Sequence, residues 1–440
     1  MIAPVSYTLL GVISGILLWF LASASNHSFS LPSGDPPDES DVARLHEIRD
    51  QTAAVRGLDV AGEVREGYLS RENLALYVDS LYESLSGRER RELETLNTVM
   101  RMLRMIGPED DLFELGAETD SLGLAGFYDY EHKRLVVISD LVGGANEEAT
   151  LAHEYTHALQ DRRFDLERFL SSPYDARSEY STTLSCVIEG DASLAQIKYL
   201  EEVYGEDWLR VLLADLEDLE VELSSLLEAQ ASIPPAILRY TTFNYNECAL
   251  FALEVWEEGG WEAVNALYED PPSTTEQVMH PERYFEGEGT LPLELENIRA
   301  SLGLGWKLAQ SGAFGEFDLY NYLASAGLQP ISAVSAAEGW GAGQLNVYTL
   351  GGGEGIDVLL HIALLWDDAA ELDQFRGAFD TALTQLDYDN RDNDEAAWTW
   401  AGGGEYGAAR WEEAAARVDL IYGTDETAVS RAMVRLSQAP

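Results

Sequence analysis

Apolar residues recur every three or four positions along much of residues 41–300, a period typical of helices that pack on one face. A different pattern stands at 135–138, where four consecutive apolar residues predict a short buried strand. A helix is expected from about Asn146, a good helix-capping residue that is followed by two acids. We therefore predict a mostly helical domain with a small sheet over residues 41–300.

The pattern changes beyond about residue 300. Glycine-rich segments at 351–353 and 402–404 predict turns. Apolar runs predict strands at 345–350, 358–366 and 418–422, and amphipathic patterns predict helices at 368–386 and 425–437. We interpret residues 301–440 as an accessory α+β domain, so the predicted fold class of the whole chain is α+β.

The amino-terminal segment has the composition of a targeting or anchoring sequence. Residues 5–24 are uncharged and strongly apolar in their central part, with a length between a secretory apolar region and a full membrane span. The segment Ala22–Ala24 has the form of a cleavage site, but no Lys or Arg precedes the apolar run. Residues 1–24 are thus predicted to be a signal peptide or an uncleaved membrane anchor, with a buried core helix as the third interpretation. Residues 25–40, rich in proline and serine, are predicted to be a linker. The remainder is expected to face outward from the cell membrane or to be secreted.

Acidic residues dominate the charge of the chain. There are 78 Asp and Glu against 28 Lys and Arg, which gives a net charge of -50. Such a charge repels phosphate, so nucleic acid and anionic lipid surfaces are poor partners, and the amino-terminal segment is the only expected contact with a membrane. The acids are spread along the whole chain, as in proteins of salt-loving archaea. This distribution predicts a salty environment and does not indicate a reaction.

The chain has two cysteines, Cys186 and Cys248. They are too few for a disulfide framework and do not form a CxxC arrangement. They could pair in an oxidising compartment, but we expect two buried free thiols.

The strongest indication of chemistry is the segment His153-Glu154-Tyr155-Thr156-His157. Residues four apart lie on the same face of a helix, so His153 and His157 can both reach one Zn²⁺ ion. Glu154 projects beside that face and can act as the general base on the attacking water. A motif this short can arise by chance, but here a strand, a glycine-containing loop and a helix cap precede it. A zincin peptidase needs that strand to align an extended substrate.

A zinc site of this kind needs a third protein ligand and one open position. Glu189 is the best candidate, because an acid in the middle of an apolar helix is costly to bury without a cation. The alternative is a Glu189 that faces solvent. The metzincin continuation is absent, since Gln160 and Arg163 stand where a glycine and the third ligand would be. If Glu189 is the third ligand, Asp191 or Asp161 is expected to orient an imidazole. If Glu189 is not a ligand, Asp191 or Asp161 is the expected replacement.

Hydrolysis also needs a donor to the developing oxyanion besides the metal. His280, in a segment that precedes a proline, is one candidate, and Tyr245 is the other. A lone histidine before proline is more often a structural cap.

Four segments in order, GFYDYEHKRLVV, LAHEYTHALQDRRFDL, IEGDASL and PPSTTEQVMHPERY, resemble a poorly characterised family of envelope-associated HExxH proteins in bacteria and archaea. That family is similar in layout to the gluzincin peptidases, whose third ligand is a glutamate. The resemblance covers roughly residues 65–290. Ser193 stands where the thermolysin-like pattern has an aspartate, so the groups that orient the ligands differ from that pattern.

The resemblance implies zinc on His153, His157 and Glu189, with Glu154 catalytic. It also implies a role for His280. The function predicted on this basis is zinc-dependent hydrolysis of peptide bonds at the cell surface, with a peptide or protein as substrate.

Two other hypotheses remain. In the first, the chain is a catalytically silent zinc-binding surface protein that acts through its carboxy-terminal domain. In the second, it is a structural surface protein in which the motif is fortuitous. The intact Glu154 argues against the first, because binding metal does not require it, and the third ligand and the preceding strand argue against the second.

The net charge predicts that the stability of the fold depends on salt. Repulsion between acids opposes the compact state, and dissolved ions screen it. The midpoint of thermal unfolding, followed by circular dichroism, should therefore rise as ionic strength increases from low to molar. A flat or falling curve would show that the acidic surface is not a source of instability.

Overall fold

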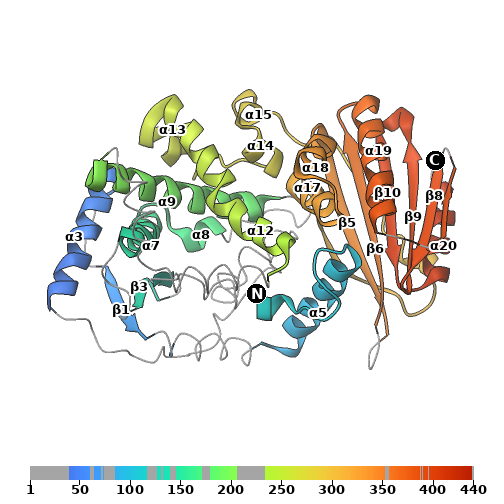
Figure 1. Ribbon diagram of the computed structural model, residues 1–440, viewed down its shortest axis with the longest axis horizontal. Helices are drawn as coiled ribbons and strands as arrows, with labels where there is room; N and C mark the ends of the chain where they lie inside the picture. The colour runs from blue at the N-terminus through green and yellow to red at the C-terminus, as the bar shows by residue number, and fades with distance from the viewer. Residues whose placement is uncertain are drawn as a thin grey trace.

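The computed structural model describes residues 39–59, 64–70, 73, 85–115, 126–129, 132–138, 145–170, 179–205, 233–351, 356–386, 388, 390–394 and 396–438. Its elements form a helical part with a three-stranded sheet and a part built on a seven-stranded sheet (Figure 1). The chain is an α+β protein, which confirms the predicted fold class.

Two adjacent helices, α7 and α9, form the centre of the helical part, and α3 packs against both. Most residues of α9 between Thr182 and Ala195 are buried, so this helix has neighbours on nearly every side. In chain order the elements of this part are α3 (Glu39–Arg56), β1 (Arg65–Leu69), α5 (Gly87–Met102), β2 (Gly126–Asp129), β3 (Arg134–Ile138), α7 (Ala145–Phe164), α8 (Leu166–Leu170), α9 (Tyr180–Tyr204), α12 (Pro235–Tyr245), α13 (Glu247–Ala266), α14 (Thr275–Met279) and α15 (Pro281–Glu286).

The small sheet has the strand order β1-β3-β2, with β1 parallel and β2 antiparallel to β3. The apolar run at 135–138 lies in β3 and is buried, as predicted. However, β3 is paired on both sides, so it has no free edge with which to align a substrate. Among the described strands the outer edges belong to β1 and β2, and β2 packs against α7.

Helices α9 and α13 are joined covalently. Cys186 and Cys248 form a disulfide, with their Cα atoms 5.2 Å apart, so the expectation of two free thiols was wrong. The two cysteines are separated by 62 positions, and only the packing of α9 on α13 brings them together. Gly190 allows this close approach, because a Cβ atom there would lie 2.3 Å from the carbonyl oxygen of Cys248.

The second part is a seven-stranded antiparallel sheet with the order β4-β5-β6-β10-β9-β8-β7. The predicted strands at 345–350, 358–366 and 418–422 are confirmed as β5, β6 and β10, and the two predicted helices as α19 and α20. In chain order the elements are α16 (Arg299–Leu302), β4 (Lys307–Ala313), α17 (Glu316–Ser325), α18 (Pro330–Ala337), β5 (Trp340–Leu350), β6 (Asp357–Trp366), α19 (Ala369–Gln385), β7 (Asn390–Asn393), β8 (Ala397–Gly402), β9 (Glu405–Glu412), a 3-10 turn (Glu413–Ala415), β10 (Arg417–Gly423) and α20 (Glu426–Ser437).

Alternate side chains of this sheet point to opposite faces, and both faces are covered. Leu360, Ile362 and Leu364 of β6 belong to the same apolar cluster as residues of α5, α17 and α19. Leu359 of β6 instead joins Ile421 and residues of α16 and α20 on the other face. The sheet is therefore buried on both sides, which explains its continuous apolar runs.

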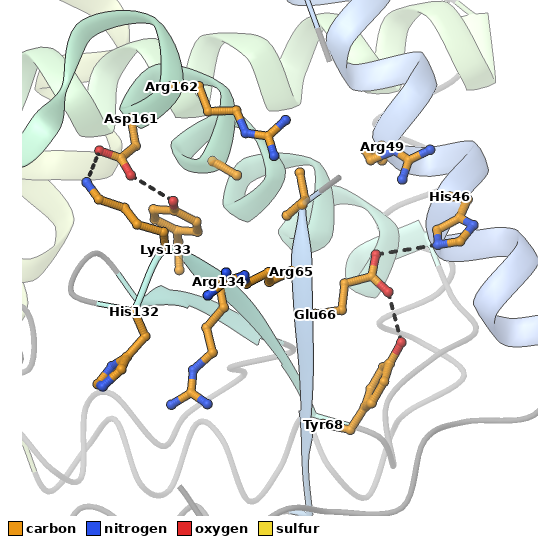
Figure 2. A pocket seen from close by; sticks show the side chains of 13 residues that line it. His46, Arg49, Arg65, Glu66, Tyr68, His132, Lys133, Arg134, Asp161 and Arg162 are labelled. Atoms are coloured by element: carbon orange, nitrogen blue, oxygen red, sulfur yellow. Dashed lines mark hydrogen bonds and ion pairs between the residues drawn. The ribbon is translucent and has the colours of Figure 1, made fainter. Parts of the chain in front are cut away.

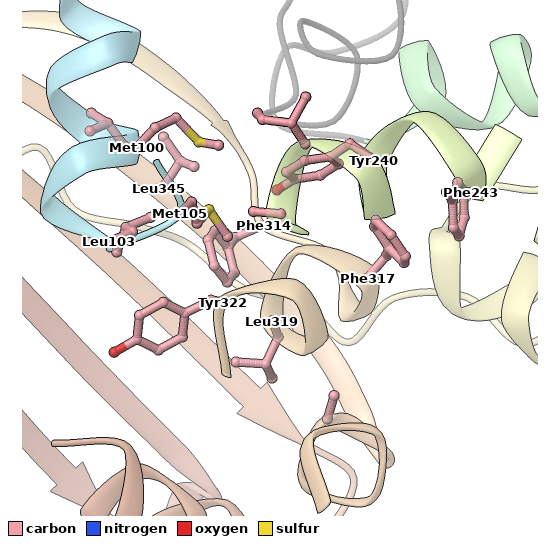
Figure 3. Packing of buried hydrophobic residues seen from close by; sticks show 14 of the residues in the cluster. Met100, Leu103, Met105, Tyr240, Phe243, Phe314, Phe317, Leu319, Tyr322 and Leu345 are labelled. Carbon is pink, nitrogen blue, oxygen red and sulfur yellow. The ribbon is translucent and has the colours of Figure 1, made fainter. Parts of the chain in front are cut away.

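The main apolar cluster extends from the helical part into the second part. Met100 and Met105, in and just after α5, lie near Phe314 and Tyr322 in and beside α17, and Tyr240 and Phe243 of α12 lie near Phe317 (Figure 3). The rings of Phe243 and Phe317 are 4.1 Å apart between centroids. The division of the chain near residue 300 stays a prediction, and the apolar core is continuous across it.

The predicted signal peptide or anchor at 1–24 lies outside the described residues, as does nearly all of the predicted linker at 25–40. Within the described part of the chain, every helix is too short or too polar to span a membrane.

Candidate metal centre

The two histidines of the HExxH segment lie on the side of α7 that faces α9. Ala149, Ala152 and Tyr155 pack into an apolar cluster with the small sheet, and this contact fixes the orientation of the helix. His153 and His157 are both buried, and their rings meet edge to face with centroids 4.7 Å apart. A helical spacing of four residues thus places both imidazoles side by side, as predicted.

Glu189 of α9 completes the group. Its Oε2 atom lies 3.1 Å from Nε2 of His153 and 3.6 Å from Nε2 of His157. Two ligand atoms about 2.1 Å from a tetrahedral zinc ion are about 3.4 Å apart, and the observed separations lie on either side of this value. These three side chains could hold a metal ion.

The electrostatics of the three groups favour a shared cation. Burial alone would lower the pKa of His157, but the neighbouring Glu189 carboxylate raises it to about 9. Burial would likewise raise the pKa of Glu189, yet His157 and His153 hold it well below its usual range. The Nδ1 atom of His153 is buried without a hydrogen-bond partner among the described residues. A positive charge among these atoms is therefore strongly favoured, and a divalent ion can supply it.

Gln160 orients one of the imidazoles. Its Oε1 atom lies 2.9 Å from Nδ1 of His157, so Nδ1 can donate to Gln160 while Nε2 faces Glu189. The Gln160 amide nitrogen donates to the carbonyl of Ile188 and to Asp191, each at 3.0 Å. Asp191 thus acts on the imidazole through Gln160 rather than directly. Hydrogen bonds of this kind fix the tautomer and direction of a metal-binding histidine.

Asp191 accepts further hydrogen bonds inside the protein. Arg56 of α3 binds it at 2.5 and 3.0 Å, and both side chains are fully buried. The hydroxyl of Tyr268 donates to the same carboxylate at 2.8 Å. Arg56 also donates to Asn265 at 2.7 Å and lies 4.4 Å from the centre of the Trp261 ring. This network connects α3, α7, α9 and α13 behind the candidate ligands.

Glu154 turns away from α9 and toward the small sheet. The backbone N–H of Tyr128, in β2, donates to its Oε2 atom at 2.9 Å. Burial raises the pKa of Glu154, and the two histidines beside it act in the opposite direction. The side chain is partly exposed to solvent. The carboxylate is therefore held at one oxygen and lies next to the ligands, where the sequence predicts the general base.

Tyr245 lies beside the centre. It is the last residue of α12, its ring centroid is 5.7 Å from that of His153, and its side chain is about half exposed. Asp161 does not approach either imidazole in the described contacts. Its carboxylate accepts from Tyr128, Lys133 and the backbone of Leu166, so the expected orienting role of Asp161 is wrong.

His280 lies between α14 and α15. Its Nε2 atom is 3.0 Å from the buried carboxylate of Glu316, the first residue of α17, and this hydrogen bond raises the pKa of His280. Its described side-chain contacts do not include His153, His157 or Glu189. The structure therefore brings the three ligands, Glu154 and Tyr245 together, and the catalytic role of His280 stays a prediction.

A second group of acids, Glu276, Glu288 and Asp367, also has oxygen atoms close to one another. The guanidinium of Arg283 forms ion pairs with all three. These acids thus have a cation from the chain itself, and they do not constitute a second metal centre.

Comparison with known proteins bears mainly on the second part of the chain. Residues 306–433 match a family model described as a domain of unknown function (DUF8575). This match covers the seven-stranded sheet and leaves the candidate metal centre outside. No curated protein matches the chain.

One solved structure is weakly similar, a protein of Chloroflexus aurantiacus described as "a putative hydrolase with a novel fold". The identity is 13%, the TM-score is 0.28, and the alignment covers 64% of this chain and 98% of that one. A TM-score this low does not indicate a shared fold. The chemistry of the centre must therefore be inferred from its own side chains.

The geometry predicts that two substitutions weaken zinc binding to different degrees. Glu189→Ala removes a ligand and should abolish tight binding. Gln160→Leu removes the group that orients His157 and should weaken binding about 10- to 100-fold. Competition with a chromogenic chelator measures both constants, and Gln196→Leu, at a partly buried position of α9 after the candidate ligand, is the matched control. If Glu189→Ala held zinc as tightly as the unchanged protein, Glu189 would not be the third ligand.

Proposed function

We propose that this chain is a zinc metallopeptidase that hydrolyses peptide bonds with Glu154 as the general base. The observation that carries the proposal is the convergence of His153, His157 and Glu189, whose potential ligand atoms all lie within 4.8 Å of one another. Glu154 lies directly beside this group. The combination is that of an HExxH peptidase with a glutamate as third ligand.

The donor set supports zinc over other divalent ions. Two imidazole nitrogens and one carboxylate oxygen are typical of catalytic zinc, whereas Ca²⁺ and Mg²⁺ prefer oxygen ligands alone. Three protein ligands leave one coordination position for water or substrate. When bound, the ion acts as a Lewis acid that polarises the peptide carbonyl and acidifies the attacking water.

Glu154 is positioned to transfer the proton. One of its oxygens is held by the N–H of Tyr128, and the side chain is partly open to solvent. The carboxylate can accept a proton from water and then return it to the leaving nitrogen of the substrate. Tyr245 lies half exposed beside His153, and this position supports its assignment as the donor to the developing oxyanion. His280 is the second candidate for that role.

The edge of β2 supports a peptide as substrate. β2 has no partner strand on its outer side among the described strands, but its four residues are buried and its Tyr128 N–H already donates to Glu154. Extended peptides bind such edges through main-chain hydrogen bonds. A substrate paired with β2 would lie next to the general base.

Glu154→Gln tests the mechanism. The substitution keeps the shape of the side chain and all three ligands, so zinc content measured by elemental analysis should stay at one ion per chain. Turnover of a quenched fluorescent peptide should fall at least ~10²-fold, the low end of what loss of a general base costs. Glu147→Gln, in the first turn of the same helix, serves as the control and should change neither quantity.

The outcomes separate the competing hypotheses. Undiminished turnover in Glu154→Gln would exclude the proposed mechanism. A protein that holds zinc but cleaves no member of a diverse peptide library would favour the catalytically silent surface protein. If the protein purified from zinc-supplemented cultures contained no stoichiometric metal, the proposal of a zinc site would be excluded.

We also propose that the protein belongs with the envelope-associated HExxH proteins that it resembles and acts at the cell surface or outside the cell. The Cys186–Cys248 disulfide supports this location, because such bonds persist mainly in oxidising compartments. The acidic composition supports a salty environment. Cell fractionation should find the protein in the membrane or extracellular fraction, and a cytosolic pool would contradict the proposal.

A further inference from the structure

A cavity of about 1480 Å³ lies between α3, α7 and the small sheet (Figure 2). Five cationic side chains and two carboxylates are among the residues that line it. The cations are Arg49, Arg65, Lys133, Arg134 and Arg162, and the carboxylates are Glu66 and Asp161. In the whole chain acids outnumber Lys and Arg by 78 to 28, whereas cations outnumber carboxylates along this lining. Three of the five cations form ion pairs with acids: Arg49 with Asp50, Lys133 with Asp161 and Arg134 with Asp129.

Two of these cations occupy neighbouring positions in the sheet. Arg65 of β1 is the register partner of Arg134 of β3, so the two side chains leave the same face of the sheet. Like charges at paired positions repel and destabilise a sheet. Arg134 donates to Asp129 at 3.0 Å, whereas Arg65 is exposed at the start of β1. An anion bound across the pair would relieve this repulsion.

Helix α7 and strand β2 each contribute residues both to the cavity and to the surroundings of Glu154. Ala158 lines the cavity and lies one helical turn after Glu154, on the same face of α7. Tyr128 lines the cavity with its side chain, and its backbone N–H binds Glu154. A chain bound along β2 beside Glu154 would therefore continue into the cavity.

We infer that this cavity binds the acidic part of a polypeptide substrate. The inference rests on the proposed peptidase function, and it adds a preference for Asp and Glu on one side of the cleaved bond. Guanidinium groups bind carboxylates through paired hydrogen bonds, which suits a peptide side chain. A protein of net charge -50 repels an acidic peptide over most of its surface, so a local excess of cations provides a preferred binding place.

The size and layout of the cavity favour a polypeptide segment over a small anion. Its volume exceeds the roughly 300–1,000 Å³ of pockets for small ligands. The cations come from separate elements, with Arg49 on α3, Arg65 on β1 and Arg162 on α7. Such a spread does not form a cradle around a single phosphate, but it can meet several carboxylates along an extended chain.

Binding can be measured without cleavage. In the Glu154→Gln full-length protein, fluorescence anisotropy would follow a labelled glutamate-rich peptide and its twin with glutamine at every glutamate position. Arg65→Ala should weaken binding of the glutamate peptide about tenfold, the size expected for loss of a charge-assisted hydrogen bond. It should leave the glutamine twin unaffected. Arg65→Lys should retain much of the affinity, and Arg435→Ala, which removes one surface charge from α20, is the matched control.

The same substitutions in the active protein give the second measurement. Arg65→Ala should lower kcat/KM for glutamate-containing substrates about tenfold and leave their glutamine twins unchanged. Equal affinities of Arg65→Ala and Arg435→Ala for the acidic peptide would overturn the inference. So would displacement of that peptide by inorganic phosphate, but not by chloride at equal ionic strength, because the cavity would then be a small-anion site. Selective binding without any cleavage would keep the cavity assignment and remove the peptidase function.

Discussion

The buried ion pair between Arg56 and Asp191 is the interaction on which the arrangement of the helical part depends. Both side chains are removed from water, and burying two charges costs several kcal/mol each unless every polar atom finds a partner. Here Gln160, Asn265 and Tyr268 supply hydrogen bonds to the pair, while Nη1 of Arg56 is buried without a hydrogen-bond partner among the described residues. These contacts require α3, α7, α9 and α13 to be in place together. The same contacts set the position of Gln160 and, through it, the direction of the His157 ring.

The sequence predicts those parts of the fold whose apolar pattern is strong. The strands β5, β6 and β10 are neighbouring interior strands of the seven-stranded sheet and are largely buried, so each contains an apolar run. β4 and β9 escape prediction because polar and small residues interrupt them, as in Glu405–Glu412. The strand order of the small sheet likewise cannot be predicted from the sequence. The apolar run indicates that β3 is buried, but it does not indicate which strands pair with β3.

The ligands of the candidate centre can be predicted because their chemistry is local. His153 and His157 are four residues apart on one helix, and Glu189 is conspicuous as an acid within an apolar run. The groups behind them are not predictable in this way. Gln160 belongs to no recognised metal pattern, although it extends the same helical stripe as the two histidines, and Arg56 lies 135 positions from its partner Asp191. The disulfide could not be predicted for the same reason, because pairing of cysteines 62 positions apart depends on the packing of two helices.

Tyr128 gives the two halves of the proposed site a thermodynamic connection. Its backbone holds Glu154, and its hydroxyl holds Asp161, which also binds Lys133 in the cationic cavity. If an occupant of the cavity displaced Tyr128, the position of Glu154 beside the candidate ligands would change with it. Such coupling is reciprocal: the factor by which the occupant changes the affinity of the centre for its ion equals the factor by which the ion changes the affinity for the occupant. Under the proposed function, one residue of a four-residue strand would thus couple binding in the cavity to the candidate metal centre.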